Sequence, residues 1–549
     1  MKSRASSQQD DQGRMATAPT YPGVYIEEIP SGVRTIAGVP TSITAFVGFA
    51  YRGPVNEPTH VQSFAEYERV FGGLWAGSTM SYAVGQFFAN GGGHALIVRA
   101  VHATGSGDKA DKKATLALGT SPNQFKLEAA NEGSWGNALR IRIDHHTRDV
   151  DTSIPGETAT TLFNLFAKDM ATGVSEEFHN VCVSPDHPRY VTRALEQESR
   201  LIRVRAPGAA LATRPDANTD PFPTGDPFSE TTSTVFVSDG NDGEGHEITD
   251  LFPPSEASEA GIWALEKADL FNLLCVPPIA REGVLTNDAR KTAANYCKRR
   301  RAFYIVDPDP TWNEPGDITA DSGLNTFNAG VERENAALYF PRVRMADVAL
   351  GGALEDFPPC GAVAGVIART DDMGGVWKAP AGQDAAIIGT QDLTVKLTDG
   401  ENGPLNALGV NCLRVFPLIG PVVWGARTLD GADMLASEWK YVPVRRLALF
   451  LEESLYRGTK WVVFEPNDAP LWAQIRLNIG TFMHNLFRQG AFQGTTPREA
   501  YFVKCDEETT TQTDIEDGVV NIVIGFAPLK PAEFVIIKIQ QLTEHSIRC

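Results

Sequence analysis

The sequence is short of the features that mark export, membrane insertion and nucleic-acid binding. Its 549 residues contain no apolar run of about 18 residues, the length a membrane-spanning helix needs, and residues 1–14 are polar where a secretory signal would be apolar. Basic residues are also few: 49 Lys and Arg face 68 Asp and Glu, and the formal charge of −19 disfavours a protein that wraps a phosphate backbone. We therefore expect a soluble, folded protein without nucleic acid as a partner and without direct membrane insertion.

Cysteine is scarce, and its placement excludes the common cysteine-based sites. Seven scattered cysteines, none in a CxxC pair, indicate neither a disulfide framework nor a zinc site and are typical of a reducing cytoplasm. They are Cys182, Cys275, Cys297, Cys360, Cys412, Cys505 and Cys549. The GxxxxGK[ST] and HExxH motifs are missing too, and the glycines at 91–93 follow a predicted helix instead of preceding one. We expect no cofactor and no metal.

Catalytic motifs are absent as well. There is no GxSxG nucleophile elbow, and Asp144, His145 and His146 fall among polar turns, away from the predicted core strands. Asp371 and Asp372 with Asp356 could bind a hard cation, but their spacing matches no calcium loop and these carboxylates are expected to be solvated. The basic run at 298–301 is interpreted as a solvated helix end, with salt bridges to acidic neighbours as the alternative. The sequence therefore predicts a protein that is not an enzyme.

The patterns that are present begin with alternating strands and helices. Residues 43–50 (ITAFVGFA) form the continuous apolar run of a strand buried on both faces. A helix is predicted at 63–71, with Ser63 as its N-cap and two glycines behind it. A second helix at 82–90 leads into a strand at 95–101. This alternation predicts a sheet covered by helices.

A change of pattern interrupts this α/β region. From residue 103 to 232 short β-like runs alternate with polar turns, which we interpret as an inserted β-rich domain. The buried-strand pattern returns at 235–240, followed by a helix ending in the run at 270–278 and by a strand at 302–308. The α/β domain is expected to resume there.

The C-terminal quarter predicts a domain of helices and strands. Apolar residues at helical spacing indicate a helix at 444–456, and a strand is predicted at 461–466. A longer helix follows, capped by Asn467 or Asp468 and ending at Gly490. Two further strand-like runs complete an α+β domain.

Strand-forming segments lie near both ends of the chain. Residues 534–542 (FVIIKIQQL) follow Pro528 and Pro531, which hinder a tight return onto the preceding strand, and residues 21–29 (YPGVYIEEI) have no obvious local partner. Such arms are satisfied when they add to the sheet of a neighbouring copy, and a head-to-tail contact of this kind builds a filament or tube. The alternative is that both strands pair inside their own chain.

Many segments in the right order resemble contractile tail sheath proteins, over nearly the whole chain outside the insert. They include TYPGVYIEEIPSGVRTI at 20–36 and GFAPLKPAEFVIIKIQQ at 525–541. The others lie at 41–73, 87–99, 131–137, 334–343, 359–371 and 405–429.

This resemblance implies an α/β multi-domain fold whose core is subtilisin-like without protease activity. It implies a partition into six parts, the C-terminal domain facing an inner tube. These are a disordered tail (1–14), an N-terminal arm (15–42), the core (43–102 and 233–425), an outer β-rich insert (103–232), the C-terminal α+β domain (426–528) and a C-terminal arm (529–549).

The resemblance also implies a function and partners. The chain would be a structural subunit that polymerises around an inner tube protein and contracts, with baseplate and terminal cap proteins as further partners. It would be made and assembled in the bacterial cytoplasm, as part of a phage tail or a released injection particle. The alternatives are a subtilisin-type hydrolase and a monomeric binding module.

The residues expected to act in assembly follow by position. Those of the N-terminal arm are Val24, Tyr25, Ile26 and Glu27. Those of the C-terminal arm are Phe534, Val535, Ile536, Ile537, Lys538 and Ile539. The expected tube contacts are polar residues of two C-terminal helices: Arg445, Glu452, Glu453, Arg476, His484 and Arg488.

Overall fold

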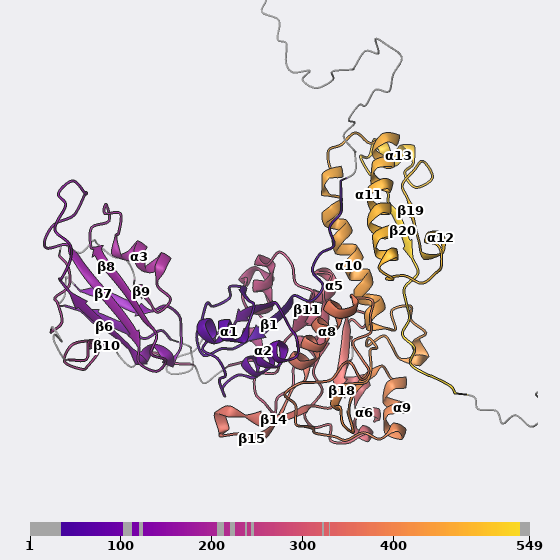
Figure 1. Cartoon of the computed structure of the whole chain (residues 1–549), viewed down its shortest axis with the longest axis horizontal. Coiled ribbons are helices and arrows are strands. Elements are labelled where there is room, and N and C mark those ends of the chain that lie inside the picture. The colour runs from indigo at the N-terminus through magenta and orange to yellow at the C-terminus, as the bar shows by residue number, and fades with distance from the viewer. Residues whose placement is uncertain are drawn as a thin grey trace, which may run out of the picture. The chain divides into compact units, whose positions relative to one another are not determined.

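A computed structural model gives the structure of the chain (Figure 1). It describes residues 34–102, 112–119, 124–205, 213–219, 225–236, 239–242, 246–320, 323–328 and 330–537. The described residues form two compact units, and one of the three boundaries between them falls within helix α10 (Val442–Gly458). The first unit contains the described part of Met1–Ala37 together with Ser454–Ala527; the second contains Gly38–Glu453 and the described part of Pro528–Cys549.

An eight-stranded sheet forms the centre of the second unit. Its six inner strands are parallel, and the two edge strands, β2 and β18, are antiparallel to their neighbours. In sheet order the strands are β18 (Gly420–Val423), β17 (Val410–Phe416), β13 (Ala336–Phe340), β12 (Phe303–Val306), β11 (Leu273–Cys275), β1 (Thr44–Gly48), β3 (Ala95–Arg99) and β2 (Thr59–Val61).

Both faces of this sheet are buried, which explains why its strands are apolar at consecutive positions. Along β12, Phe303 and Ile305 belong to one hydrophobic cluster, while Tyr304 and Val306 belong to the other. The first cluster includes helices α2 (Thr79–Ala89) and α8 (Cys360–Gly374); the second includes α5 (Asn287–Arg299) and a 3₁₀ helix at Gly261–Lys267. Because successive side chains of a strand point to opposite faces and both faces are covered, every residue of the inner strands β1, β3, β11, β12 and β13 is buried.

Helices α2 and α8 approach closely because α8 carries glycine at the contact. A Cβ atom on Gly361 would lie 2.0 Å from the carbonyl oxygen of Ala83, and one on Gly365 would lie 2.5 Å from that of Phe87. Each overlap would be with a backbone atom, so no side chain can replace these hydrogens without separating the helices.

Smaller elements surround the sheet. Helix α1 has Ser63 as its N-cap, as predicted, and its Oγ accepts a hydrogen bond from the Glu66 N–H. A three-stranded sheet lies at one side, in the order β15, β14, β16. The bounds are α1 (Phe64–Phe71), α4 (Ile248–Leu251), α6 (Pro315–Thr319), α7 (Leu324–Phe327), α9 (Asp399–Ala407), β14 (Val343–Asp347), β15 (Ala353–Phe357) and β16 (Asp392–Leu393).

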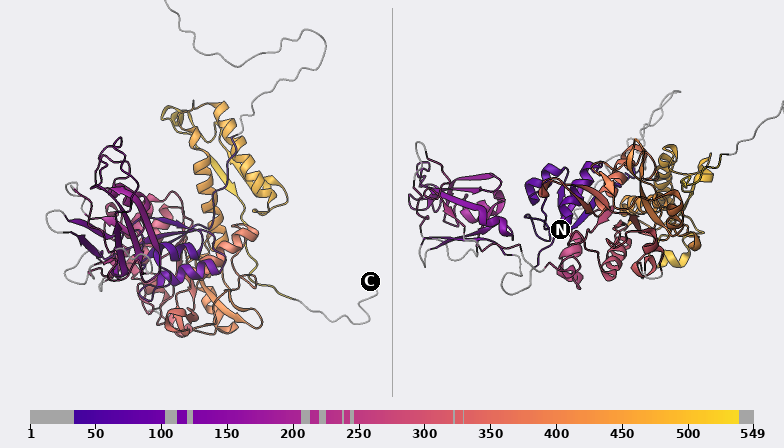
Figure 2. Two further views of the ribbon diagram at one scale, coloured as in Figure 1. Left: turned by 60° about the vertical axis from the view of Figure 1, so that its left-hand side comes forward. Right: turned by 90° about the horizontal axis from the view of Figure 1, so that it is seen from below.

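The segment expected to be an insert folds as a group of strands and an α-helix (Figure 2). It has a hydrophobic cluster of its own, which includes Trp135, Phe163 and Leu195. It contains a four-stranded antiparallel sheet and a three-stranded one. The first, in order, is β10 (Thr234–Val235), β6 (Leu139–Asp144), β7 (Leu162–Asp169) and β8 (Ser175–Cys182). The second is β4 (Thr115–Leu118), β5 (Phe125–Ala129) and β9 (Ile202–Val204), and helix α3 spans Val191–Glu198.

The first unit is built on helix α11 (Ala469–Arg488), whose buried face includes Trp472, Ile479 and Phe482. It also contains the end of α10 (Val442–Gly458) and the two-stranded antiparallel sheet β19–β20. The incoming chain packs here as well, because the Arg34 N–H donates to Asn478 Oδ1 at 3.0 Å. The remaining bounds are α12 (Pro497–Ala500), β19 (Tyr501–Lys504), α13 (Gln512–Glu516) and β20 (Val523–Phe526).

Three secondary-structure predictions were wrong. The run at 270–278 contains strand β11, not the end of a helix, because it pairs with β1 and β12. Of the strand predicted at 235–240, the described residues show β10 at Thr234–Val235, which pairs with β6 of the four-stranded sheet and not with the core. The strand predicted at 461–466 is a 3₁₀ turn at Lys460–Val462 and a loop in which Phe464 has a φ of 72°.

Candidate assembly surfaces

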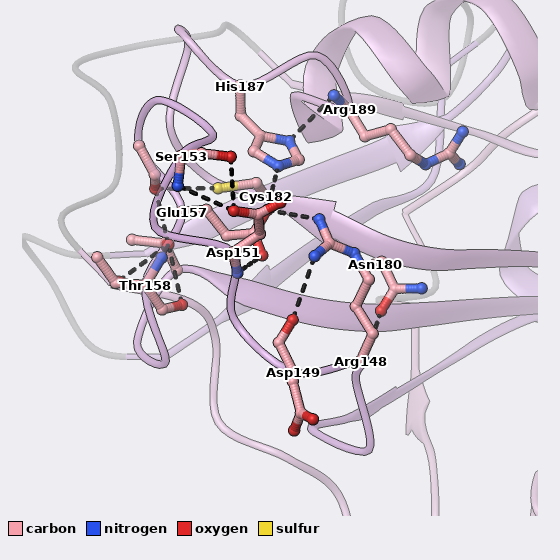
Figure 3. Close-up of polar contacts among 12 residues, drawn as sticks. Arg148, Asp149, Asp151, Ser153, Glu157, Thr158, Asn180, Cys182, His187 and Arg189 are labelled. Carbon is pink, nitrogen blue, oxygen red and sulfur yellow. Dashed lines mark hydrogen bonds and ion pairs between the residues drawn. The ribbon is translucent and has the colours of Figure 1, made fainter.

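The densest polar cluster of the β-rich segment surrounds the buried carboxylate of Glu157 (Figure 3). Its Oε2 accepts from Arg148 Nη2 at 2.6 Å and from His187 Nε2 at 3.0 Å, and its Oε1 accepts from the Asp151 N–H at 2.9 Å. Burial alone would raise the pKa of Glu157, but these hydrogen bonds outweigh it and hold the pKa below its usual range. The cluster therefore ties the 148–158 loop together with an ionised carboxylate.

This cluster does not have the chemistry of a catalytic triad. His187 Nδ1 accepts the Arg189 N–H at 3.0 Å, so the proton of the neutral ring sits on Nε2 and is donated to Glu157. Both ring nitrogens are thus engaged, and neither can take a proton from a nucleophile. Of the residues considered from the sequence, His145 bonds the Pro215 carbonyl through Nε2, and Asp144 pairs with Arg142 at 3.2 Å and accepts the backbone N–H of His146 at 3.1 Å.

The charged motifs of the core are engaged in ion pairs. All four residues of the basic run at 298–301 contact acidic side chains, as in the salt-bridge alternative; Arg301, for example, lies 3.0 Å from Glu453. Asp371, expected to be solvated, is buried instead and lies 2.6 Å from Arg446. Within the described ranges, no group of three metal-ligating side chains occurs and no helix is long and apolar enough to cross a membrane.

The C-terminal segment is held to the second unit at one side chain, Glu533. Its two carboxylate oxygens accept from Arg427 Nε at 2.8 Å and from Arg427 Nη2 at 2.5 Å, a bidentate pair. Tyr441 Oη donates to the same carboxylate at 3.3 Å. Arg427 could not be recognised from the sequence, because its partner lies 106 positions further along the chain.

Immediately after Glu533 the apolar segment is exposed. Phe534, Val535, Ile536 and Ile537 are 76, 81, 81 and 78% exposed. The other arm residues named above, Lys538, Ile539 and the N-terminal set at 24–27, lie outside the described residues. Four consecutive exposed apolar residues are unusual on the surface of a monomeric protein.

The two-stranded sheet β19–β20 is the second incomplete element. Tyr501 pairs with Phe526 and Lys504 with Val523, and among the described residues no third strand joins either side. Phe502 and Val523 remain 50 and 46% exposed. A two-stranded sheet is marginal by itself, and its open edges offer backbone groups to a further strand.

The residues expected to contact a tube differ widely in exposure. Arg445 is buried and donates to Asn335 Oδ1 at 3.0 and 3.1 Å, while Glu452 and Glu453 are paired with Arg445 and Arg301. Arg476 donates to the carbonyl of Cys505. In contrast, His484 and Arg488 lie on the exposed face of α11.

The fold and these surfaces can now be compared with known proteins. The family model described as "Phage tail sheath protein central domain" matches residues 256–429, and the one described as "Phage tail sheath C-terminal domain" matches residues 436–541. Together they cover more than half of the chain. The chain belongs to the contractile tail sheath family. This is a family of structural proteins, which confirms the expectation that the chain is not an enzyme.

Individual relatives agree with this assignment. The tail sheath protein of Vibrio phage KVP40 is 27% identical over 179 residues, 32% of this chain and 25% of the relative. The chain thus matches about a quarter of the length of that relative.

Two solved structures share the fold of this sheath family member. One is the sheath complex, in its contracted state, of the PVC extracellular contractile injection system (TM-score 0.55, 22% identity, covering 96% of this chain and 99% of that one). The other is the sheath tail protein Lin1278 from Listeria innocua (TM-score 0.57, 13% identity, covering 90 and 96%). Both support a mixed α/β multi-domain architecture.

Proposed function

We propose that this chain is the sheath subunit of a contractile particle, which polymerises around an inner tube and contracts to drive the tube through a target envelope. The observation that carries the proposal is the exposed apolar segment Phe534–Ile537, together with family membership. A monomeric protein would have to cover this segment, whereas a polymer covers it with a neighbouring copy.

The proposed contact between subunits is strand addition. The C-terminal arm, residues 534–539, extends from one copy and pairs with an open edge of β19–β20 in another copy. The N-terminal arm, with Val24–Glu27, occupies an edge in the same way and enters its own subunit at Arg34, which is held by Asn478. Donor and acceptor lie on different surfaces, so the contact is heterologous and builds an open helical assembly.

Contraction follows from an assembly joined by such arms. The extended lattice is metastable, and a signal from the baseplate lets one ring of subunits rotate into a packed arrangement of lower free energy. The rearrangement then passes along the sheath, with the paired arms keeping subunits connected while their bodies gain contacts. This process needs no nucleotide or other cofactor.

The tube-facing surface is proposed to lie on the C-terminal domain. His484 and Arg488 are the best placed of the six expected residues, because they are exposed on α11 beside the half-exposed Leu477. Arg445 and Glu453 are already engaged within the chain and would have to exchange partners. An apolar residue flanked by polar ones is a common composition for a protein interface.

The domain layout remains part of the proposal. It comprises a subtilisin-like core without protease activity, an outward-facing β-rich insert, a C-terminal tube-facing domain and two arms, with the boundaries predicted above. The insert has its own hydrophobic core, so it can vary without disturbing the central sheet. Assembly in the bacterial cytoplasm, an inner tube, a baseplate and a terminal cap complete the proposed setting.

Electron microscopy of the purified chain, alone and co-expressed with a tube protein from the same particle, tests this function. We expect hollow striated cylinders in at least one of the two preparations. Dispersed monomers in both would overturn the sheath proposal and favour a monomeric binding module. A fluorophosphonate serine probe provides the enzyme control, and labelling of the folded chain would favour the hydrolase.

A further inference from the structure

The C-terminal segment changes from anchored to exposed between two consecutive residues. Between Leu529 and Ile537, Glu533 is the only residue found to make a hydrogen bond or ion pair with the rest of the described chain. The next residue, Phe534, is already 76% exposed. Any force applied to the exposed segment therefore reaches the subunit first at the Glu533 carboxylate.

The partner of this carboxylate, the Arg427 guanidinium, is held in place by several further hydrogen bonds. The Arg427 side chain is buried, and besides Glu533 its Nη1 donates to the carbonyls of Asn406 at 2.8 Å and Gly431 at 3.2 Å and to Asp433 Oδ1 at 2.9 Å. A guanidinium held by several acceptors has one orientation, and its planar fork matches a carboxylate. Arg427 therefore presents a rigid receptor to Glu533.

The backbone of Arg427 is fastened to the central sheet. Asn411, on β17, accepts the Arg427 N–H at 2.6 Å and donates to the Arg427 carbonyl at 2.7 Å. The same amide group donates to the Leu338 carbonyl, on the adjacent strand β13, at 3.1 Å. The pair Arg427–Glu533 thus connects the C-terminal segment, through one buried asparagine, to two neighbouring parallel strands.

We propose that the Arg427–Glu533 pair is the anchor through which the C-terminal arm transmits load to the core. The partner is a second copy of this chain, which binds the segment Phe534–Ile537 and pulls on it when subunits move. This inference rests on the proposed sheath function. Glu533 is a positioning residue: it fixes where the arm leaves the subunit and leaves the apolar residues free for the neighbouring copy.

Limited proteolysis of the full-length chain, kept unassembled at low concentration, tests the anchor without polymerisation. Glu533→Gln keeps the size of the side chain but removes its charge, and Glu533→Ala removes the contact. We expect chymotrypsin to cleave after Phe534 about tenfold faster in both variants, because the protease can bind this bond only when Glu533 leaves Arg427, while the unfolding midpoint stays unchanged. Asp433→Asn is the matched control, because Asp433 contacts the same guanidinium but lies outside the arm. An unchanged cleavage rate would overturn the anchor, and so would a lowered unfolding midpoint, since the contact would then support the whole fold.

Shearing assembled sheaths tests the mechanical role. We expect Glu533→Gln sheaths to form, because the strand-forming segment is intact, but to break into pieces several-fold shorter than those of the wild type and of Asp433→Asn. Equal fragment lengths would contradict load transfer at this pair. If the wild type itself forms no sheath with its tube, the proposed function fails, while the proteolysis experiment still decides whether Glu533 holds the segment.

Discussion

The eight-stranded sheet and the two-stranded sheet β19–β20 differ in how their edges end. In the larger sheet the edge strand β18 is covered by the chain at 385–387, with the Ile387 N–H bonded to the Pro421 carbonyl at 2.8 Å, and the other edge is the three-residue strand β2. In the smaller sheet both outer sides are open among the described residues, and Phe502 is half exposed. The core sheet therefore finds its strand partners within the described chain, whereas β19–β20, which we assign to assembly, keeps edges to which a further strand can bind.

The largest expected effect comes from removing the exposed apolar segment, which should abolish assembly without changing the stability of the fold. A chain that stops after Glu533 keeps the anchor and the whole described core but lacks the exposed apolar segment. We expect it to unfold with a wild-type midpoint and to form no long polymers, because the C-terminal strand that adds to β19–β20 is gone and the N-terminal arm alone cannot link the subunits. Thermal unfolding and electron microscopy of the same samples check both halves of the expectation. Normal cylinders from this truncation would refute strand addition by the C-terminal arm.

A matched pair of phenylalanine substitutions tests the difference in packing. Phe303 is fully buried in β12, so Phe303→Ala should destabilise the second unit by about 3–5 kcal/mol. Phe502→Ala should cost about 1 kcal/mol or less in unfolding free energy, because half of that ring is already in water. Urea denaturation of both variants gives the comparison. Equal losses would mean that β19 is packed as a core strand within its own subunit.

The sequence predictions succeeded where the signal is local and failed where it depends on residues distant in the sequence. Local signals succeeded: the Ser63 cap, helix α10 and the Asp468 cap of α11 all depend on residues a few positions apart. The strand β11 was mistaken for the end of a helix because a short apolar run fits either element, and only its pairing with β1 and β12 decides. The loop around Phe464 was mistaken for a strand because its composition suits one, although no strand pairs with it in the part of the chain that the structure describes.

Only the part of the candidate site that depends on neighbouring residues could be predicted from the sequence. The strand-forming composition of 534–537 is a local property, and the sequence showed it together with the prolines that precede it. Its anchor is not local: Glu533 is an ordinary surface residue in the sequence, and Arg427 is one of many arginines. Only the fold, through Asn411 on β17, brings them within 3 Å of each other.

Two helix glycines, one in each unit, provide a further comparison of how tightly the units are packed. Gly361→Ala should destabilise the second unit by about 1–3 kcal/mol, because its Cβ would overlap the Ala83 carbonyl oxygen and force α2 away from α8. Gly480→Ala, in α11 of the other unit, meets no atom within 4 Å and should stabilise that helix by up to about 1 kcal/mol. Differential scanning calorimetry shows the two shifts in opposite directions. A stable Gly361→Ala protein would contradict the close approach of the two helices.

The smallest expected effect is a pH dependence confined to the core. Burial raises the pKa of Asp307 to about 6, although hydrogen bonds from Cys360 and the charge of Arg342 oppose the shift. A carboxyl with a folded pKa above its unfolded value destabilises the protein when ionised, so this penalty is present above about pH 6 and disappears as the pH falls through the unfolded pKa. Asp307→Asn keeps an oxygen to accept the Cys360 N–H and should stabilise the protein by about 1–2 kcal/mol at pH 8.

Unfolding of Asp307→Asn and wild type at pH 8 and pH 4 measures this effect. The difference should shrink towards zero at pH 4, where the wild-type carboxyl is protonated in the folded protein. Asp372→Asn, an exposed position on α8, is the control and should change stability little at either pH. Asp307 lies at the end of β12 and accepts a hydrogen bond from the first turn of α8. A stabilised variant that still assembles would show that the ionised carboxylate destabilises the core and is not needed for assembly. A variant less stable at pH 8 would instead mean that the carboxylate's attraction to Arg342 outweighs its burial.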